Sequence, residues 1–576
     1  MKHANLVVAM LAIALSCAPA RSQQLSPDSA LAPLVRQYQV DDQSVRTYFD
    51  LRWSSARLDA QEQLARRRLA ELNAVPFDTL DSPARADAVL LRFKLEDALS
   101  SIAIDRSRLA EMRPLLPHLP LLEQIETLRS EMTPLDLPAL AAQFSAVPEQ
   151  IRQVRARIVR SGEQSGEGSI VVSPSLALRT ASASEDALDK LERWNRHYRD
   201  FVPEFGWWMD KPIAAVRDAL RDYHHFLRAD LAAQRGDPGD PLVGDPAGRE
   251  RLVQELRREM IAYTPEELIA IGQRELAWCQ AELRAASLEM GLGDDFLAAI
   301  EKVKQQHVPP GEQAGYITRQ AEQAIAFVSE LVTVPDLCAR LWRTQMIPAH
   351  DQRIWPFAAY GDAVVMVSYA TDEMDTAEKL MSMRGNNRHF TRIVVPHELI
   401  PGHHLQRYVH DRVRPYRRAF ETPFFVEGWA LYWEFELWDR GYAQTPEDRV
   451  GMLFWRSHRA ARIITSLQFH LGQITPEQWI DFLVTQVGHE RASAVGEVRR
   501  SINGMYSPLY QVAYMIGGIQ IRALRDESVG QGRLSQRAFN DALIQQGPIP
   551  VEIIRAQMLD LPIEPGFEPS WRFDEH

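Results

Sequence analysis

Residues 392–406 read Arg-Ile-Val-Val-Pro-His-Glu-Leu-Ile-Pro-Gly-His-His-Leu-Gln and lie in the most histidine-rich part of the chain. Five of the 16 histidines (His389, His397, His403, His404 and His410) fall between 389 and 410, where an even spread would place fewer than one. Catalytic zinc is bound by neutral imidazole and carboxylate groups, and one coordination position stays open for water. His397 and a histidine about one helical turn later can face one ion, and Glu398 between them suits a general base. The stretch therefore predicts a catalytic zinc site, whereas we expect the outlying His389 and His410 to be structural.

Two adjacent histidines compete for the second ligand position. On an unbroken helix His404 would lie ~10.5 Å beyond His397 along the axis, and His403 would point about 120° away from His397. Pro401 lacks a backbone N–H and Gly402 tolerates unusual dihedral angles, so a local break in the helix is expected. If these two residues bulge out as an insertion, His403 regains the spacing of an i, i+4 pair. We therefore assign His403 to the metal and leave His404 to orient substrate or to hydrogen-bond nearby.

The third ligand is expected on the next helix. Residues 424–435 are strongly apolar, with isolated acidic positions. Glu427 follows the second histidine ligand by 24 residues, and a carboxylate on an apolar face is costly unless it is paired or bound to a metal. Glu434 lies on nearly the same face and could be the hydrogen-bond partner of a ligating histidine. Glu421 and Glu436 are expected to be solvated.

Composition and charge exclude several classes of protein. The chain has 576 residues, of which 45% are hydrophobic and 25% charged, as in soluble globular proteins. Disordered, collagen-like and membrane-bundle proteins are excluded on this basis. Acidic residues outnumber basic ones by 77 to 65, so we expect no nucleic-acid partner, which would call for a basic excess. No segment is long and apolar enough to predict a transmembrane helix.

The N-terminus resembles a secretory signal peptide. A short basic start precedes the apolar run Leu6–Leu15, and small residues continue to Ala20. Cleavage is expected after Ala20, or alternatively after Ser22, which predicts a periplasmic or secreted protein. Cys17 raises the alternative of a lipoprotein anchor, but Ala14 stands where such signals usually carry leucine, so this alternative is less favoured.

Apolar residues recur at steps of three and four through most of the chain, which predicts a mainly α protein. Thr264-Pro-Glu-Glu and Thr475-Pro-Glu-Gln are helix-start signals, and the first of these helices is expected to end at Gly291. The best strand candidates are Ala363–Tyr369 and Ser169–Val172. We expect a signal peptide at 1–20, a helical N-terminal part at 21–330 and a catalytic zinc-binding part at 331–576. Cys279 and Cys338 are expected to be buried thiols on helices, with a disulfide between them as the alternative.

The motif His-Glu-Leu-Ile-Pro-Gly-His-His-Leu-Gln, followed by Glu427-Gly-Trp-Ala-Leu-Tyr, resembles the bacterial family catalogued as domain of unknown function eight-eight-five. Thr264-Pro-Glu-Glu-Leu, Arg459-Ala-Ala-Arg462 and Tyr514-Met-Ile-Gly517 also agree, so the resemblance covers most of the mature chain. That family is grouped with the zincin metallopeptidases, alongside thimet oligopeptidase and angiotensin-converting enzyme. The resemblance implies a large helical zincin-type fold with a small β edge element and a substrate cleft. It implies Zn²⁺ on His397, His403 and Glu427, with Glu398 as the base.

Hydrolysis of an amide builds negative charge on the carbonyl oxygen, which a nearby donor stabilises. Tyr506, Tyr510 and Tyr514 are four residues apart and are expected to share one helix face. A tyrosine from a late helix has this role in the related oligopeptidases, which makes Tyr514 the catalytic candidate and Tyr510 a substrate-binding one. The alternative is that the three rings are ordinary core.

The remaining parts of a peptide site are less specific. The strand Ala363–Tyr369 could bind an extended peptide by backbone pairing, as edge strands do. Arg459 or Arg462 could hold a substrate carboxylate.

The expected function is hydrolysis of short peptides by metal-activated water. The alternatives are a metal-dependent amidase acting on cell-wall peptides and a non-catalytic zinc-binding protein. Structural zinc sites are usually closed by four ligands and rich in cysteine, but this cluster has no cysteine. Endo- or exopeptidase action and the oligomeric state stay open.

Overall fold

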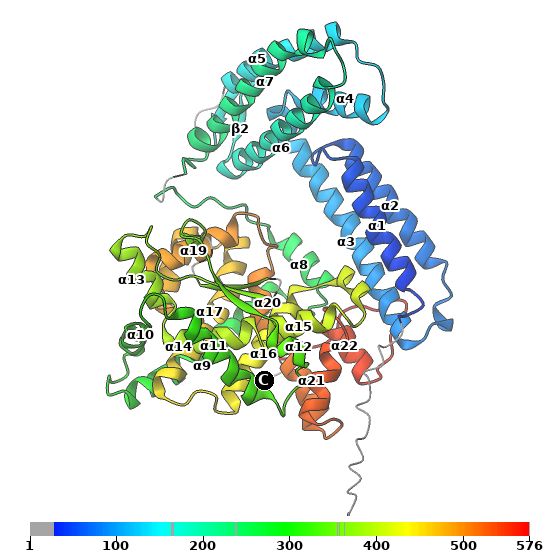
Figure 1. Cartoon of the computed structure of the whole chain (residues 1–576). Coiled ribbons are helices and arrows are strands. Elements are labelled where there is room, and N and C mark those ends of the chain that lie inside the picture. Colours follow the sequence, from blue (N-terminus) through cyan, green and yellow to red (C-terminus); the bar gives the residue numbers. More distant parts are fainter. Residues whose placement is uncertain are drawn as a thin grey trace, which may run out of the picture.

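The computed structural model describes residues 28–162, 166–236, 239–353, 355, 357–361 and 363–574. The predicted signal peptide and Cys17 lie outside these residues. The described chain is mainly helical with two small sheets, which confirms the predicted fold class (Figure 1). None of its helices is both long and apolar enough to cross a bilayer.

The helices and strands fall into three groups along the chain. The first group contains α1 (Ala32–Tyr48), α2 (Ser55–Asn73) and α3 (Ser82–Met112). The second contains α4 (Leu119–Ser130), α5 (Leu137–Arg157), β1 (Ile158–Arg160), β2 (Ile170–Val172), α6 (Pro174–Arg199) and α7 (Phe205–His225). The third contains α8 (Arg249–Arg258), α9 (Pro265–Glu289), α10 (Phe296–Lys304), α11 (Gln313–Val328), α12 (Asp336–Arg340), β3 (Arg343–Met346), β4 (Ala358–Gly361), β5 (Val364–Val367), α13 (Thr376–Gly385), α14 (Arg388–Glu398), α15 (His403–His410), α16 (Pro423–Asp439), α17 (Pro446–His470), α18 (Pro476–Phe482), α19 (Arg491–Ile502), α20 (Tyr510–Arg525), α21 (Gln536–Ile544) and α22 (Val551–Met558).

Two large hydrophobic cores organise these groups. The larger core contains residues of α1–α3 together with α8 and the helices that follow it. The other lies between Leu51 and Leu227 and is built mainly from α4–α7. Figure 1 shows α4–α7 as a layer above the main body, with α3 reaching from one to the other. The larger core thus draws on both sides of residue 330, and the domain boundary predicted there stays a prediction.

The two helix-start signals act as expected. Thr264 and Thr475 each cap a helix with a reciprocal capping box, at the start of α9 and α18. α9 ends just before Gly291, which has a positive φ of 75°. Cys279 on α9 and Cys338 on α12 are both buried and free, so the prediction of buried thiols is confirmed and the disulfide alternative is wrong.

The strand predicted at Ala363–Tyr369 forms as β5, but it is not an edge strand. The sheet order is β3-β5-β4, with β3 parallel and β4 antiparallel to β5. β5 therefore already has a strand on each side, and pairing of a peptide with β5 is excluded. Its run of consecutive apolar residues suits a central strand with both faces covered.

Glycines let the helices of the main body cross closely where the candidate site lies. A Cβ at Gly428 on α16 would approach the backbone of Gly517 on α20 to 2.6 Å, closer than real Cβ atoms come. On α17, a Cβ at Gly451 would overlap the carbonyl group of His389 on α14. These contacts bring the middle of α20 against the first turns of α16, and α14 against α17.

Candidate metal centre

The His-Glu motif spans the junction of two helices. α14 ends at Glu398 and α15 begins at His403, so the predicted break in the helix is present. In the connecting turn the amide of Gly402 donates to the carbonyl of Pro396 at 2.9 Å. A Cβ at Gly402 would overlap the carbonyl oxygen of His397. Only glycine therefore fits the turn that returns the chain to His397.

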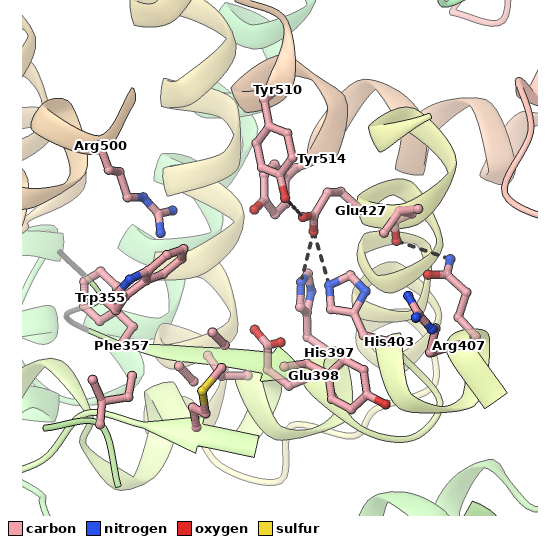
Figure 2. A pocket seen from close by; sticks show the side chains of 18 of the residues that line it. Trp355, Phe357, His397, Glu398, His403, Arg407, Glu427, Arg500, Tyr510 and Tyr514 are labelled. Carbon is pink, nitrogen blue, oxygen red and sulfur yellow. Dashed lines mark hydrogen bonds and ion pairs between the residues drawn. The ribbon is translucent and has the colours of Figure 1, made fainter. Parts of the chain in front are cut away.

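The structure brings together the three predicted ligands. Nε2 of His403 lies 3.2 Å from Oε2 of Glu427, and Nε2 of His397 lies 3.7 Å from the same oxygen. The three candidate ligand atoms lie within 4.8 Å of one another (Figure 2). Zinc bonds of about 2.0–2.2 Å at tetrahedral angles separate neighbouring ligands by roughly 3.3–3.6 Å. The spacing of this cluster therefore suits a single small cation.

Two further side chains orient the cluster. Nδ1 of His397 lies 2.7 Å from Oε1 of Glu434, so this nitrogen donates and Nε2 is left free to act as a ligand. The hydroxyl of Tyr510 donates to Oε1 of Glu427. Oε2 of Glu427 is buried, makes no hydrogen bond among the described residues, and faces both imidazoles.

The electrostatics of the cluster favour a positive charge. Burial would lower the pKa of His397, but the nearby carboxylates of Glu427 and Glu434 outweigh this effect and raise the pKa to about 9. Burial would likewise raise the pKa of Glu427, yet His403 and His397 hold it well below its ordinary value. The buried carboxylates of Glu427 and Glu434 thus lie on either side of the ring of His397, and such a buried pair is stabilised by a positive charge between or beside them.

Glu398 opens onto a cavity next to the cluster. The cavity has a volume of about 620 Å³ and is lined by His397, His403, Glu427 and Glu398 as well as by residues of β4 and of α17. Figure 2 shows Arg500 and Trp355 across this space from His397 and Glu427, with Glu398 between the two sides. A ligand in the cavity would therefore touch the cluster and Glu398 together.

Tyr514 lies over the cluster and lines the same cavity. The residue is 8% exposed, and its ring stacks on the ring of His397 with centroids 6.3 Å apart. Burial, followed by the charge of Glu427, raises the pKa of Tyr514 above its ordinary value, so its hydroxyl keeps its proton. Tyr514 can therefore donate a hydrogen bond to a group in the cavity.

The predicted tyrosine face is only partly helical. α20 begins at Tyr510, so Tyr506 lies before the helix, and the prediction that it shares the helix is wrong. Its ring nevertheless stacks on Tyr510 with centroids 4.3 Å apart. The hydroxyl of Tyr510 donates a hydrogen bond to Glu427, so in this structure Tyr510 positions the carboxylate of Glu427.

His404 points away from the cluster. Its Nε2 lies 3.0 Å from the carbonyl of Cys338 and its Nδ1 lies 3.0 Å from the hydroxyl of Tyr360. Because both ring nitrogens are occupied and the side chain is buried, we replace the substrate-binding role predicted for His404 with the hydrogen-bonding alternative. His404 ties α15 to β4 and α12.

The other predicted polar residues differ in their surroundings. His389 lies between Asp448 and Gln306, 2.8 and 2.9 Å from them, as expected of a structural residue. His410 is buried but also lines the cavity, so its structural role stays a prediction. Glu436 was expected to be solvated, but it is buried and its Oε2 lies 2.9 Å from Arg440. That prediction is wrong because an arginine one turn on neutralises the carboxylate.

Sequence reasoning missed the side of the cavity formed by α19. Arg500 lines the cavity, and Glu497 behind it is fully buried. Nothing in the surrounding sequence distinguishes these two residues from an ordinary helical ion pair. Their place in the site follows from how α19 packs, which no local pattern encodes.

The fold and the cluster define a mainly helical protein with a His-His-Glu site at a cavity. A comparison with protein families matches residues 46–558 to the family described as "Bacterial protein of unknown function (DUF885)". The chain belongs to this family.

Solved structures show the same fold. One, described as "a putative lipoprotein of unknown function" from Shewanella oneidensis, is 18% identical with a TM-score of 0.68, covering 92% of this chain and 100% of that one. Another, described as "the putative lipoprotein from Colwellia psychrerythraea", is 16% identical with a TM-score of 0.57, covering 92% and 99%. A search of curated proteins found no match.

Proposed function

We propose that this protein is a zincin-like metallopeptidase that hydrolyses short peptides. The observation that carries the proposal is the arrangement of Glu427, whose buried Oε2 faces Nε2 of His397 and of His403 while Glu398 opens onto the adjoining cavity. Two imidazoles and one carboxylate, with a general base next to the first histidine, are the donor set of catalytic zinc in metallopeptidases.

The residues present fit a zinc ion. The two histidines offer Nε2, and Tyr510 occupies one oxygen of Glu427 so that the other is left for the metal. Bound zinc would polarise the peptide carbonyl and lower the pKa of an attacking water. A cavity on the same side of the cluster leaves room for substrate, unlike a structural site closed by four protein ligands. This favours an enzyme over a non-catalytic zinc protein.

The chain's own residues would then move the proton and hold the substrate. Glu398 would accept the proton of the attacking water and pass it to the amine that leaves. The protonated hydroxyl of Tyr514 would donate to the carbonyl oxygen as negative charge develops there. Glu434 would keep His397 oriented throughout by its hydrogen bond to Nδ1.

We also propose that the chain is exported. The proposal rests on the signal-like residues before Ala20 and is compatible with the lipoprotein descriptions of the two structural neighbours. Mass spectrometry of the N-terminus from membrane and soluble fractions would distinguish cleavage after Ala20 from lipidation of Cys17. A chain that retains residues 1–20 would contradict export through this segment.

A digestion experiment tests the activity. The purified protein is incubated with a library of short peptides after removal of metal by a chelator, and again after zinc is restored. The proposal expects cleavage products by mass spectrometry only in the zinc-restored sample. Equal cleavage in both samples, or none in either with zinc bound, would contradict a zinc peptidase.

A further inference from the structure

The cavity wall beyond Tyr514 is formed by three buried arginines. Arg459 and Arg462 lie on α17 and Arg500 on α19, and all three line the cavity. Their side chains are only 7%, 2% and 12% exposed. Burying guanidinium groups is unfavourable unless carboxylates or a bound anion compensate them.

Protein carboxylates compensate only part of this charge. Glu497 lies 2.6 Å from Nε of Arg462 and 2.9 Å from Nε of Arg500. Arg459 makes no hydrogen bond among the described residues, and its ion pair is a 3.7 Å contact with Glu434, which already accepts from His397. In the direct ion pairs three guanidinium groups thus share two carboxylates, one of which also accepts from His397, while Glu427 acts on Arg462 only at longer range.

Individual nitrogen atoms also lack partners. Nε of Arg459 and Nη1 of Arg462 are buried and make no hydrogen bond in the described part of the chain. A buried donor left without an acceptor is unfavourable, and more so when it is charged. Arginine presents its N–H groups in a planar fork that suits the two oxygens of a carboxylate.

The arginines lie close to the metal ligands. The guanidinium carbons of Arg459 and Arg462 are 4.8 and 4.6 Å from the centroid of Tyr514. That ring in turn stacks 6.3 Å from the ring of His397. The distance from the guanidinium groups to the ring of His397 is therefore at most the length of about three extended peptide residues, at roughly 3.3–3.6 Å each.

We propose that Arg459, Arg462 and Arg500 form a subsite for the free C-terminal carboxylate of a peptide substrate. A carboxylate there would give Nε of Arg459 and Nη1 of Arg462 the acceptor that they lack among the described residues. The scissile bond would then lie within about the last three residues, so the enzyme removes short pieces from the carboxyl end. The cleavage part of this inference rests on the proposed peptidase function, whereas the binding part does not.

Binding to the full-length, metal-free protein tests the subsite without any turnover. Calorimetry compares four peptides. N-acetyl-Ala-Ala-Phe has a free C-terminal carboxylate, and its C-terminal amide has none. N-acetyl-Ala-Ala-Asp amide has only a side-chain carboxylate, and the matching N-acetyl-Ala-Ala-Asn amide has none. The proposal expects the free acid to bind about 10–100-fold more tightly than its amide, because charge-assisted hydrogen bonds are worth about 1.5–3 kcal/mol. Equal binding of N-acetyl-Ala-Ala-Phe and its amide would overturn the proposal. It would also be overturned if N-acetyl-Ala-Ala-Asp amide, whose carboxylate is in the side chain, bound as tightly as N-acetyl-Ala-Ala-Phe.

Arg459→Gln isolates the contribution of the unpaired arginine. It should abolish most of the preference for the acid, whereas Arg459→Lys should restore part of it. The matched control is Arg456→Gln on the same helix, where Arg456 pairs with Glu275 at 2.8 Å and does not line the cavity. Circular dichroism checks the fold of each variant, and the acid–amide comparison on the unaltered protein decides the matter if a variant unfolds.

The same peptides incubated with the zinc-loaded protein separate the two proposals. If the acid binds preferentially but no peptide is cleaved, the subsite stands and the peptidase proposal fails. If both acid and amide are cleaved at equal rates at the same bond, the peptidase proposal stands and the carboxylate subsite is overturned.

Discussion

Gly402 packs against the carbonyl oxygen of His397 so closely that any side chain at Gly402 would overlap it. This contact closes the turn between α14 and α15 and sets His403 beside His397, with ring centroids 4.9 Å apart. The position of His403 beside His397 therefore depends on Gly402, which has no side chain that could bind a ligand.

Gly402→Ala should consequently lose the metal site and destabilise the protein by about 3 kcal/mol or more, because the added Cβ overlaps backbone atoms that cannot move independently. Urea unfolding and zinc content measure the two effects. The matched control is Gly315→Ala on the exposed face of α11, where the Cβ meets only the end of Arg319 at 3.6 Å. That variant should be about 0.5–1 kcal/mol more stable than the parent. A Gly402→Ala protein with the parent's stability and zinc content would contradict this role of the turn.

Glu398→Gln should keep the parent's zinc content and lose about 10²–10⁴-fold in turnover, because amide replaces the group that accepts the proton. Glu398 is not one of the three residues of the candidate metal cluster, so the substitution should leave metal binding unaffected. Peptide cleavage rates and zinc content are measured on the same sample. Wild-type cleavage by this variant would assign the base to another residue.

Tyr510 and Tyr514 should differ although they are one turn apart on α20. Tyr510→Phe removes the hydrogen bond to Glu427 and should weaken zinc binding by about 10–100-fold. Tyr514→Phe should leave zinc affinity unchanged and lower kcat by about 10²–10³-fold, the effect of losing an oxyanion donor. Zinc titration and steady-state kinetics separate the two. The reverse pattern would exchange their roles.

The spacing of the sequence was sufficient to group His397, His403 and Glu427, because these candidate ligands come from three consecutive helices, α14, α15 and α16, whose polar positions stand out against apolar surroundings. Pro401 and Gly402 also indicated the break between α14 and α15. The choice between the adjacent histidines rested on the geometry of that break, and the structure turns His404 toward Tyr360 and Cys338.

Other features depended on packing that no local pattern contains. The apolar run of β5 is consistent with either a central or an edge strand of a small sheet, and only the positions of β3 and β4 decide between them. The four-residue spacing of the tyrosines did not reveal that α20 begins at Tyr510. Arg500 reaches the cavity, with Glu497 buried behind it, because α19 packs there, and the sequence of a helix does not indicate which part of the protein it will pack against.

His118 should make the protein less stable in mild acid. Burial lowers the pKa of His118 to about 4, so the folded protein holds this ring neutral while the unfolded chain takes up a proton near pH 6.5. Its contribution is therefore fully present above pH 6.5 and is lost as the pH falls towards 4. Between pH 7.5 and 5.0 the parent should lose about 2 kcal/mol more than His118→Gln in urea unfolding.

The control for this measurement is His350→Gln, since the side chain of His350 is 77% exposed. That variant should follow the parent at both pH values. Equal losses by the parent and His118→Gln would show that His118 does not contribute to acid sensitivity.

The zinc content of His403→Ala, measured by mass spectrometry beside that of the parent and of His404→Ala after dialysis against micromolar zinc, tests the metal centre most directly. The arrangement of His397, His403 and Glu427 predicts about one zinc per chain in the parent and in folded His404→Ala, and almost none in His403→Ala. A parent that binds no zinc, or a site that empties only in His404→Ala, would contradict it.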